Sequence, residues 1–175
     1  GLPGIANAVF NDHNLTLVVM ENGTTAMTGH QNHPASGENF NNEGNEIPVK
    51  QVLEGLGVKN IYKVDTYAQN KLKEKMKEAL NDKGFSVVIA SHPCMLKFTR
   101  EARKKGNYKD NKAIIDQEEC KNIHECVSEF GCPSFQKEED GTIWVHTDLC
   151  IGDGSCFQTC PVNAIKMDKS KGGNK

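Results

Sequence analysis

The sequence predicts an α/β domain with a parallel sheet, followed by a small α+β domain that is rich in cysteine. Helical and strand-like segments alternate up to residue 90, which is the order of elements in sheets with right-handed crossovers. Six of the seven cysteines then fall between Cys120 and Cys160. We therefore expect one domain over 1–113 that ends in a charged linker, a second over 114–168, and a disordered tail over 169–175.

The first domain is expected to contain three helices and three strands. The apolar residues of 2–13 and 68–81 recur at helical spacing, and Pro3 suits a first helical turn. The apolar, partly β-branched run at 15–20 is typical of a buried parallel strand. The predicted order is helix 2–13, strand 15–20, helix 48–56, strand 60–64, helix 68–81 and strand 85–90.

The segment after the first strand is a candidate binding site, because ligands of parallel sheets bind at the carboxyl ends of the strands. This segment runs from Glu21 to Gln31 and contains the pair Asn22-Gly23. On these residues alone a simple turn is the favoured interpretation, since Asn-Gly is a common turn pair. Cys94 follows the last apolar run and is expected to be a buried structural thiol.

The second domain carries two cysteine half-repeats, each of which ends in Cys-Pro. They read Cys120-x5-Cys126-x5-Cys132-Pro133 and Cys150-x5-Cys156-x3-Cys160-Pro161. Bacterial ferredoxins use C-x2-C-x2-C-x3-C-P, in which three thiolates bind one cluster and the fourth binds the other. The spacing predicts a ferredoxin-like domain with two iron–sulfur clusters and short β pieces around 141–145. The charged stretch 99–115 is interpreted as the linker that precedes it.

Each half-repeat lacks the second cysteine of the ferredoxin pattern. Ile123 replaces it in the first half and has no donor atom, whereas Asp153 replaces it in the second and is a harder ligand than thiolate. The crossover rule then gives three ligands to the first site (Cys120, Cys126 and Cys160) and four to the second (Cys132, Cys150, Asp153 and Cys156). We expect a [3Fe-4S] centre, or a labile [4Fe-4S] cluster with an exogenous ligand, in the first site and an aspartate-bound [4Fe-4S] cluster in the second. His124 is a weaker candidate for the missing ligand, because it is one residue out of register.

Other interpretations of the cysteines fit the sequence less well. Zinc sites usually carry C-x2-C pairs, and this chain has none. Disulfide frameworks belong to secreted chains, whereas the cysteine count here is odd and no secretory leader is present. A ferredoxin domain that has lost one cluster remains an open alternative, because Ile123 and Asp153 are changes that such a loss would produce.

Composition narrows the expected partners. The net charge of −2 argues against nucleic acid, and no segment approaches the roughly 20 apolar residues that span a membrane. The density of free thiols indicates a reducing, cytoplasmic setting. The chain begins at Gly1 rather than Met, which indicates a piece of a longer polypeptide.

The stretch from Leu17 to Pro34, LVVMENGTTAMTGHQNHP, resembles the thiamine-diphosphate-binding region of the α subunits of indolepyruvate ferredoxin oxidoreductases. These belong to the 2-oxoacid:ferredoxin oxidoreductase superfamily. The preceding helix, the Cys94 segment and a double-cluster ferredoxin domain follow the same order in that family, so the resemblance covers essentially the whole chain. It implies that the first domain is part of a thiamine-diphosphate-binding domain.

The resemblance also implies how the cofactor is held. The amide oxygen of Asn22 and the backbone carbonyl of Thr24 match the family's ligands for Mg²⁺, a hard ion that prefers oxygen. Gly23 would let the turn pass close to the diphosphate. Thr25 and Thr28 are candidates to donate hydroxyls to the diphosphate or the substrate. His30 and Gln31 are candidates to touch the 2-oxoacid.

The family's Gly-Asp-Gly or Gly-Asp-Ser magnesium element would lie before Gly1. The resemblance therefore implies that the N-terminal part of the α subunit supplies it, and that the isolated chain does not bind thiamine diphosphate tightly. The implied reaction is oxidative decarboxylation of an aryl or branched 2-oxoacid with coenzyme A, in assembly with a β subunit, with electrons passed to ferredoxin. Two alternatives are a stand-alone electron-transfer module and a degenerate interaction subunit without activity.

Overall fold

The computed structural model describes residues 1–41 and 43–168, and it divides into two compact units between Glu101 and Ala102. This boundary lies inside helix α4 (Met95–Lys104) rather than near residue 113. The expected linker 99–115 holds the C-terminal part of α4 and strand β4 (Lys112–Ile115) instead. Its charges are compatible with a helix, because Arg103 and Lys104 lie in the last turn, where cations interact favourably with the helix dipole.

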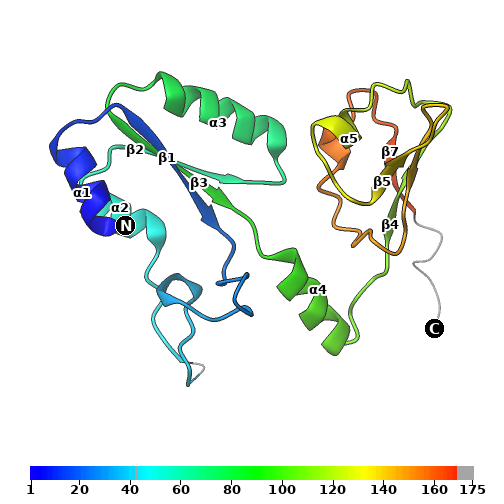
Figure 1. Ribbon diagram of the computed structural model, residues 1–175. Coiled ribbons are helices and arrows are strands. Elements are labelled where there is room, and N and C mark those ends of the chain that lie inside the picture. The colour runs from blue at the N-terminus through cyan, green and yellow to red at the C-terminus, as the bar shows by residue number, and fades with distance from the viewer. Residues whose placement is uncertain (42, 169–175) are drawn as a thin grey trace. The chain divides into compact units, whose positions relative to one another are not determined.

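The first unit contains a three-stranded parallel sheet of order β1-β3-β2, which confirms the predicted α/β fold (Figure 1). The strands are β1 (Leu15–Glu21), β2 (Asn60–Asp65) and β3 (Phe85–Ser91). The helices are α1 (Leu2–Phe10), α2 (Val49–Gly55) and α3 (Gln69–Asn81). Helix α1 ends three residues earlier than predicted, because Asp12 takes a left-handed conformation with φ of 49°.

Helices cover both faces of this sheet, so the central strand β3 is buried from Phe85 to Ala90. Val87 and Ile89 pack with Leu53 of α2 and Ala8 of α1 on one face. Helix α3 packs on the strands from the other face, where the Thr16 hydroxyl donates to the carbonyl of Ala79 at 3.1 Å. The continuous burial explains why 85–90 has an apolar rather than an alternating sequence.

Strand β1 lies at one edge of the described sheet. Its apolar side chains Leu15, Val18 and Met20 are exposed, and Met20 keeps 83% of its surface in contact with solvent. Unpaired edges with apolar side chains favour pairing with further chain segments. The position of this edge is important because β1 leads directly into the candidate site at Asn22.

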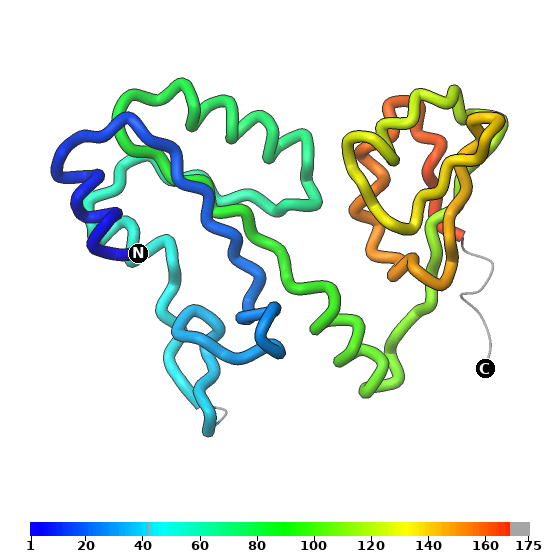
Figure 2. The backbone as a smooth tube through the Cα atoms, viewed as in Figure 1, coloured from blue at the N-terminus to red at the C-terminus, as the bar shows by residue number. Residues whose placement is uncertain are grey.

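The second unit contains two small antiparallel sheets around one core. Strand β4 pairs with β7 (Ile165–Asp168), so the two ends of the described unit run side by side (Figure 2). Strand β5 (Phe135–Lys137) pairs with β6 (Ile143–Val145), so one of the two β pieces expected around 141–145 lies there and the other lies earlier, at 135–137. The remaining helical pieces are α5 (Glu125–Ser128), η2 (Phe157–Thr159) and, in the first unit, η1 (Pro34–Ser36).

The core of the second unit combines ordinary apolar side chains with cysteines. Ala113, Phe135, Ile143 and Ile165 are buried together with Cys156, and four further cysteines pack against this cluster. None of the helices in the described part of the chain is long and apolar enough to cross a membrane. The expected disordered tail 169–175 lies outside the described residues.

Candidate functional site

The six cysteines of the second unit line two separate cavities. The larger, of about 370 Å³, is lined by Cys132, Cys150, Asp153 and Cys156 among others. The smaller, of about 20 Å³, is lined by Cys120, Cys126 and Cys160 together with Ile123. These two sets are the groups that the ferredoxin crossover rule assembles from the sequence. Each cavity therefore takes one cysteine from the other half-repeat.

The larger cavity is built by the loop from Cys150 to Cys156. Gly152 and Gly154 take positive φ angles of 68° and 76°, which allows the loop to curl tightly. Burial raises the pKa of the Cys156 thiol to about 12, and the nearby Asp153, Cys150 and Cys132 add to this shift. Metal-free Cys156 is therefore a neutral thiol, and binding to iron would release its proton.

Hydrogen bonds reach two of the sulfur atoms in this cavity. The backbone N–H of Ala113 donates to Cys150 Sγ at 3.4 Å. The Sγ of Cys132 lies 3.4 Å from the hydroxyl of Ser134. Such hydrogen bonds are one of the factors that set the potential of an iron–sulfur cluster.

The smaller cavity has room for about one water molecule. Burial raises the pKa of Cys126, and the neighbouring sulfurs of Cys120 and Cys160 raise it further. Ile123 contributes an apolar side chain at the position of the absent cysteine. His124 also lines the cavity, but its Nε2 is engaged with the carbonyl of Gly141 at 2.9 Å.

The donor sets fit clusters rather than single ions. Among residues 1–41 and 43–168, no three His, Cys, Asp or Glu side chains are arranged to hold one metal ion. A cluster differs from a single ion because it brings its own sulfides, so its thiolates surround it instead of converging on one atom. Three thiolates and a carboxylate around 370 Å³ suit a cubane. The smaller cavity offers three cysteines and no fourth ligand at Ile123, and its volume of about 20 Å³ is that of a single water molecule.

In the first unit, the loop after β1 is closed on itself. The Asn22 side-chain oxygen accepts the backbone N–H of Thr24 at 3.1 Å. The buried Thr24 hydroxyl and the Thr25 N–H both donate to the carbonyl of Gln31, at 3.2 and 2.9 Å. Gly23 takes a φ of 69°, and a Cβ there would meet no atom within 4 Å. The arrangement leaves one lone pair of the Asn22 oxygen for a further contact.

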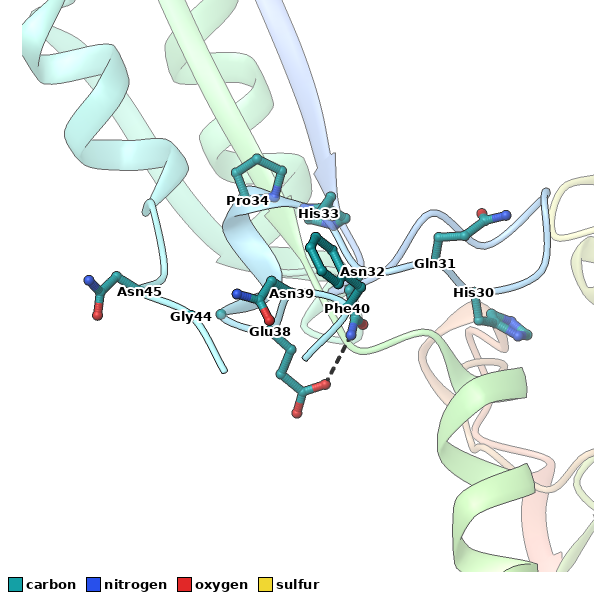
Figure 3. A pocket seen from close by; sticks show the side chains of 11 residues that line it. His30, Gln31, Asn32, His33, Pro34, Glu38, Asn39, Phe40, Gly44 and Asn45 are labelled. Carbon is teal, nitrogen blue, oxygen red and sulfur yellow. Dashed lines mark hydrogen bonds between the residues drawn. The ribbon is translucent and has the colours of Figure 1, made fainter. Parts of the chain in front are cut away.

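The predicted cofactor residues divide between two cavities. Asn22 and Gly23 line one of about 340 Å³ at the carboxyl ends of β1 and β3, together with Cys94. His30 and Gln31 line another of about 640 Å³ that also contains Phe40 (Figure 3). Thr24, Thr25 and Thr28 line neither of these two cavities. The Thr28 hydroxyl is instead bonded to the side chain of Gln31.

Cys94 is half-buried rather than fully buried, and it touches the candidate site. Its N–H donates to the carbonyl of Asn22 at 3.0 Å, and its Sγ lies 3.7 Å from Nε2 of His30. The Nδ1 of His30 lies 3.2 Å from the guanidinium of Arg100, which can only donate, so Nδ1 accepts and Nε2 carries the proton. Sequence reasoning missed this group because His30 and Cys94 are 64 residues apart and carry no shared motif.

The two units therefore combine a parallel α/β domain, whose candidate site follows its edge strand, with a ferredoxin-like cysteine domain. The family model for the C-terminal TPP-binding domain of thiamine pyrophosphate enzymes matches residues 2–90, just over half of the chain. The chain belongs to this family. A 4Fe-4S binding domain matches residues 143–166.

Curated relatives match almost the whole chain. Indolepyruvate oxidoreductase subunit IorA of Archaeoglobus fulgidus is 35% identical over 97% of this chain and 27% of the relative. The protein of the same name from Pyrococcus horikoshii is 34% identical over 95% of this chain and 26% of the relative. Pyruvate synthase subunit PorD of Methanothermobacter marburgensis is 33% identical over 39% of this chain and 79% of its own length. The chain spans about a quarter of the length of the IorA relatives.

Proposed function

We propose that this chain is part of a thiamine-diphosphate-dependent 2-oxoacid:ferredoxin oxidoreductase. The observation that carries the proposal is one chain that joins a TPP-binding domain to two cavities lined by ferredoxin-type cysteines. The reaction would convert a 2-oxoacid and coenzyme A to acyl-CoA and carbon dioxide, and its two electrons would leave one at a time to ferredoxin. Bound thiamine diphosphate would supply the electron sink for the decarboxylation.

The loop after β1 would hold the diphosphate through Mg²⁺. Asn22 would contribute its amide oxygen and Thr24 its backbone carbonyl, which are ligands that suit this ion. Gly23 would keep the turn free of a side chain, and Thr25, Thr28 and His30 would contribute polar contacts. The hydrogen bonds from Thr24 and Thr25 to Gln31 support this role, because they fix the turn before any ligand binds.

The second unit would carry the electrons through two unequal centres. Cys120, Cys126 and Cys160 would bind a [3Fe-4S] centre or a labile [4Fe-4S] cluster, since Ile123 offers no fourth ligand. The second centre would be a [4Fe-4S] cluster bound by Cys132, Cys150, Asp153 and Cys156. The ligand sets support this inequality, since the first site has three cysteines and the second has three cysteines and Asp153. The smaller cavity, of about 20 Å³, would have to widen to admit either kind of cluster.

An arylpyruvate such as indolepyruvate is the substrate that we propose. The cavity beside His30 and Gln31 has a volume of about 640 Å³, within the range typical of small-molecule sites. Phe40 and Pro34 give it apolar surface, while Asn32 and Glu38 share a hydrogen bond of 3.2 Å at its wall (Figure 3). An aromatic ring would pack on the apolar part, and the His30 and Gln31 side chains, which contact Arg100 and Thr28 in the structure, would turn to contact the oxoacid group.

The proposed enzyme needs further polypeptide. The remainder of the α subunit would supply the first part of the magnesium motif, and the exposed side chains of β1 support contact with another segment. A β subunit and ferredoxin are the other proposed partners. We also propose a cytoplasmic location, because the structure pairs none of the seven cysteines in a disulfide and cysteines stay reduced in a reducing compartment.

Iron and acid-labile sulfide content, measured anaerobically with electron paramagnetic resonance before and after dithionite, tests the cluster assignment. Two unequal centres predict seven irons for a [3Fe-4S] and a [4Fe-4S] cluster, with a signal from the three-iron centre in the oxidised protein. Ile123→Cys should add the missing thiolate, raise the iron content by one and remove that signal. No iron would contradict the electron-transfer role, and eight irons in the unaltered protein would contradict a three-iron centre.

A stand-alone electron-transfer module is a second candidate. The match to PorD favours it, because that relative aligns over most of its length with only 39% of this chain. Binding of thiamine diphosphate and Mg²⁺ in the assembled enzyme distinguishes the two. Calorimetric binding that is lost in Asn22→Ala supports the oxidoreductase, whereas clusters without any cofactor binding support the module.

A further inference from the structure

Ser134 is a buried hydroxyl group at the wall of the larger cysteine cavity. Only 3% of its surface is exposed, and it lines the cavity together with Cys132 and Cys156. Its Oγ lies 3.4 Å from the Sγ of Cys132. The ligand assignment above gives Ser134 no part, since its oxygen replaces none of the ferredoxin cysteines.

The direction of this hydrogen bond follows from the chemistry of the cysteine. A cysteine that binds iron is a thiolate and has no proton to donate. Ser134 must therefore donate its hydroxyl proton to Cys132 Sγ once a cluster is present. The backbone holds the serine in position. The Ser134 carbonyl accepts the N–H of His146 at 2.7 Å, and the ring of Pro133, the residue before it, fixes the φ angle of the chain there.

We propose that Ser134 raises the reduction potential of the second cluster through its hydrogen bond to the Cys132 thiolate. This inference rests on the proposed function of the second unit. Reduction adds negative charge that the cluster shares with its sulfur ligands, and a donor at the sulfur stabilises this charge. Burial strengthens the effect, because water does not compete for the hydroxyl in this place.

The smaller cavity provides a comparison within the same unit. There the backbone N–H of Ala164 donates to Cys160 Sγ at 3.3 Å, in parallel with the Ala113 bond to Cys150. The contact of Cys120 Sγ is with the Asn122 side chain at 3.6 Å, on an exposed part of the loop. The backbone donors thus have counterparts in both cavities, whereas Ser134 adds a buried hydroxyl to the second. Ser134 is therefore a positioning residue for electron transfer.

The test is an anaerobic redox titration of the purified protein in its native assembly, followed by electron paramagnetic resonance. Ser134→Ala and Ser134→Gly both remove the hydroxyl, and Ser134→Thr retains it. Ser128→Ala is the matched control, because its hydroxyl bonds to the carbonyl of His124 and not to a sulfur. The first cluster serves as an internal reference in every sample.

We expect Ser134→Ala and Ser134→Gly to disfavour reduction of the second cluster about tenfold, which corresponds to a potential lower by about 59 mV for one electron. Ser134→Thr and Ser128→Ala should leave the potential unchanged. A potential that stays constant in the hydroxyl-free variants, with the cluster intact, overturns the inference and leaves the proposed function standing. Loss of the second cluster from all three Ser134 variants also overturns it, because the serine would then maintain the fold. An unaltered protein without iron contradicts the proposed function itself.

Discussion

Gly152 is the position where a single added methyl group should remove the second cluster site. It lies between Cys150 and Asp153 and has a φ of +68°. A Cβ at this residue would lie 1.9 Å from the carbonyl oxygen of Asn111 and 2.8 Å from its carbonyl carbon. Both atoms belong to the backbone, so no side chain can rotate to relieve the contact. Relief requires the cysteine loop to move away from the start of β4.

The magnitude can be worked out against Gly131, which has a φ of +64° and no atom within 4 Å of its Cβ position. Gly131→Ala adds only the cost of the left-handed conformation, about 1–2 kcal/mol. Gly152→Ala adds the same cost and an overpacking term of about 1–3 kcal/mol. Separation of the loop from β4 also weakens the bonds from Lys112 to the Cys150 carbonyl at 2.8 Å and from Ala113 to its sulfur.

Thermal unfolding of the two variants, followed by circular dichroism with and without iron, measures the difference. We expect Gly152→Ala to melt at least about 4 °C below Gly131→Ala, since 1 kcal/mol corresponds to about 4–8 °C in a domain of this size. The Gly152 variant should also bind about four irons fewer after reconstitution, the content of one [4Fe-4S] cluster. Equal melting temperatures for the two variants would refute the reasoning from the Asn111 contact.

Three further predictions concern charge and ligands. Burial is the largest single influence on Glu21 and raises its pKa. The hydrogen bonds from Lys63 and Ser91 together outweigh burial, so the pKa lies below its usual 4.5. A lowered pKa stabilises the fold above pH 4.5, and this contribution is lost as the pH falls below that value. The Glu21→Gln variant lacks this contribution, so its free energy of unfolding in urea should fall less between neutral and acid pH than that of Glu54→Gln, a change at an exposed residue. Equal falls in the two variants would contradict this. Asn22→Ala should weaken the binding of thiamine diphosphate with Mg²⁺ at least about tenfold in calorimetry of the assembled enzyme, while Asn11→Ala, on the exposed end of α1, should leave it unchanged. Asp153→Cys should slow the loss of visible absorption when the protein is exposed to a chelator, because thiolate binds iron–sulfur centres more firmly than carboxylate; faster loss would exclude a ligand role for residue 153.

The regular elements of the first unit could be predicted from periodicity, and the deviations have local causes. The three predicted strands and the three predicted helices all occur, and the continuous apolar sequence of β3 reflects its burial on a parallel sheet. The expectation that 15–20 is also buried was wrong for the described sheet, because β1 lies at its edge with Leu15, Val18 and Met20 exposed. The stretch 99–115 was misinterpreted, since charge alone does not distinguish a linker from an exposed helix. The pairing of β4 with β7 was also missed, because Lys112–Ile115 and Ile165–Asp168 are four-residue strands at opposite ends of the second unit.

The candidate sites were predictable where ligand chemistry fixes spacing and less so where tertiary contacts decide. The crossover rule alone groups the cysteines as the two cavities do, because cluster geometry imposes a fixed spacing on the chain. No such rule connects His30 with Cys94 and Arg100, which meet only through the sheet. The separation of Asn22 from His30 into two cavities was likewise invisible, since both lie on one short loop. The roles of these residues stay predictions.

The crossover also bears on whether the domain has lost a cluster. Each cavity draws cysteines from both half-repeats, so a change in one half affects the ligands of both sites. If the first site no longer bound a cluster, Cys120 and Cys126 would have no ligand role, since neither lines the larger cavity. Both remain beside Cys160: burial raises the pKa of Cys126, and the sulfurs of Cys120 and Cys160 raise it further. A three-ligand centre at this site therefore stays a proposal, and the iron content of the Ile123→Cys variant distinguishes it from a site that has lost its cluster.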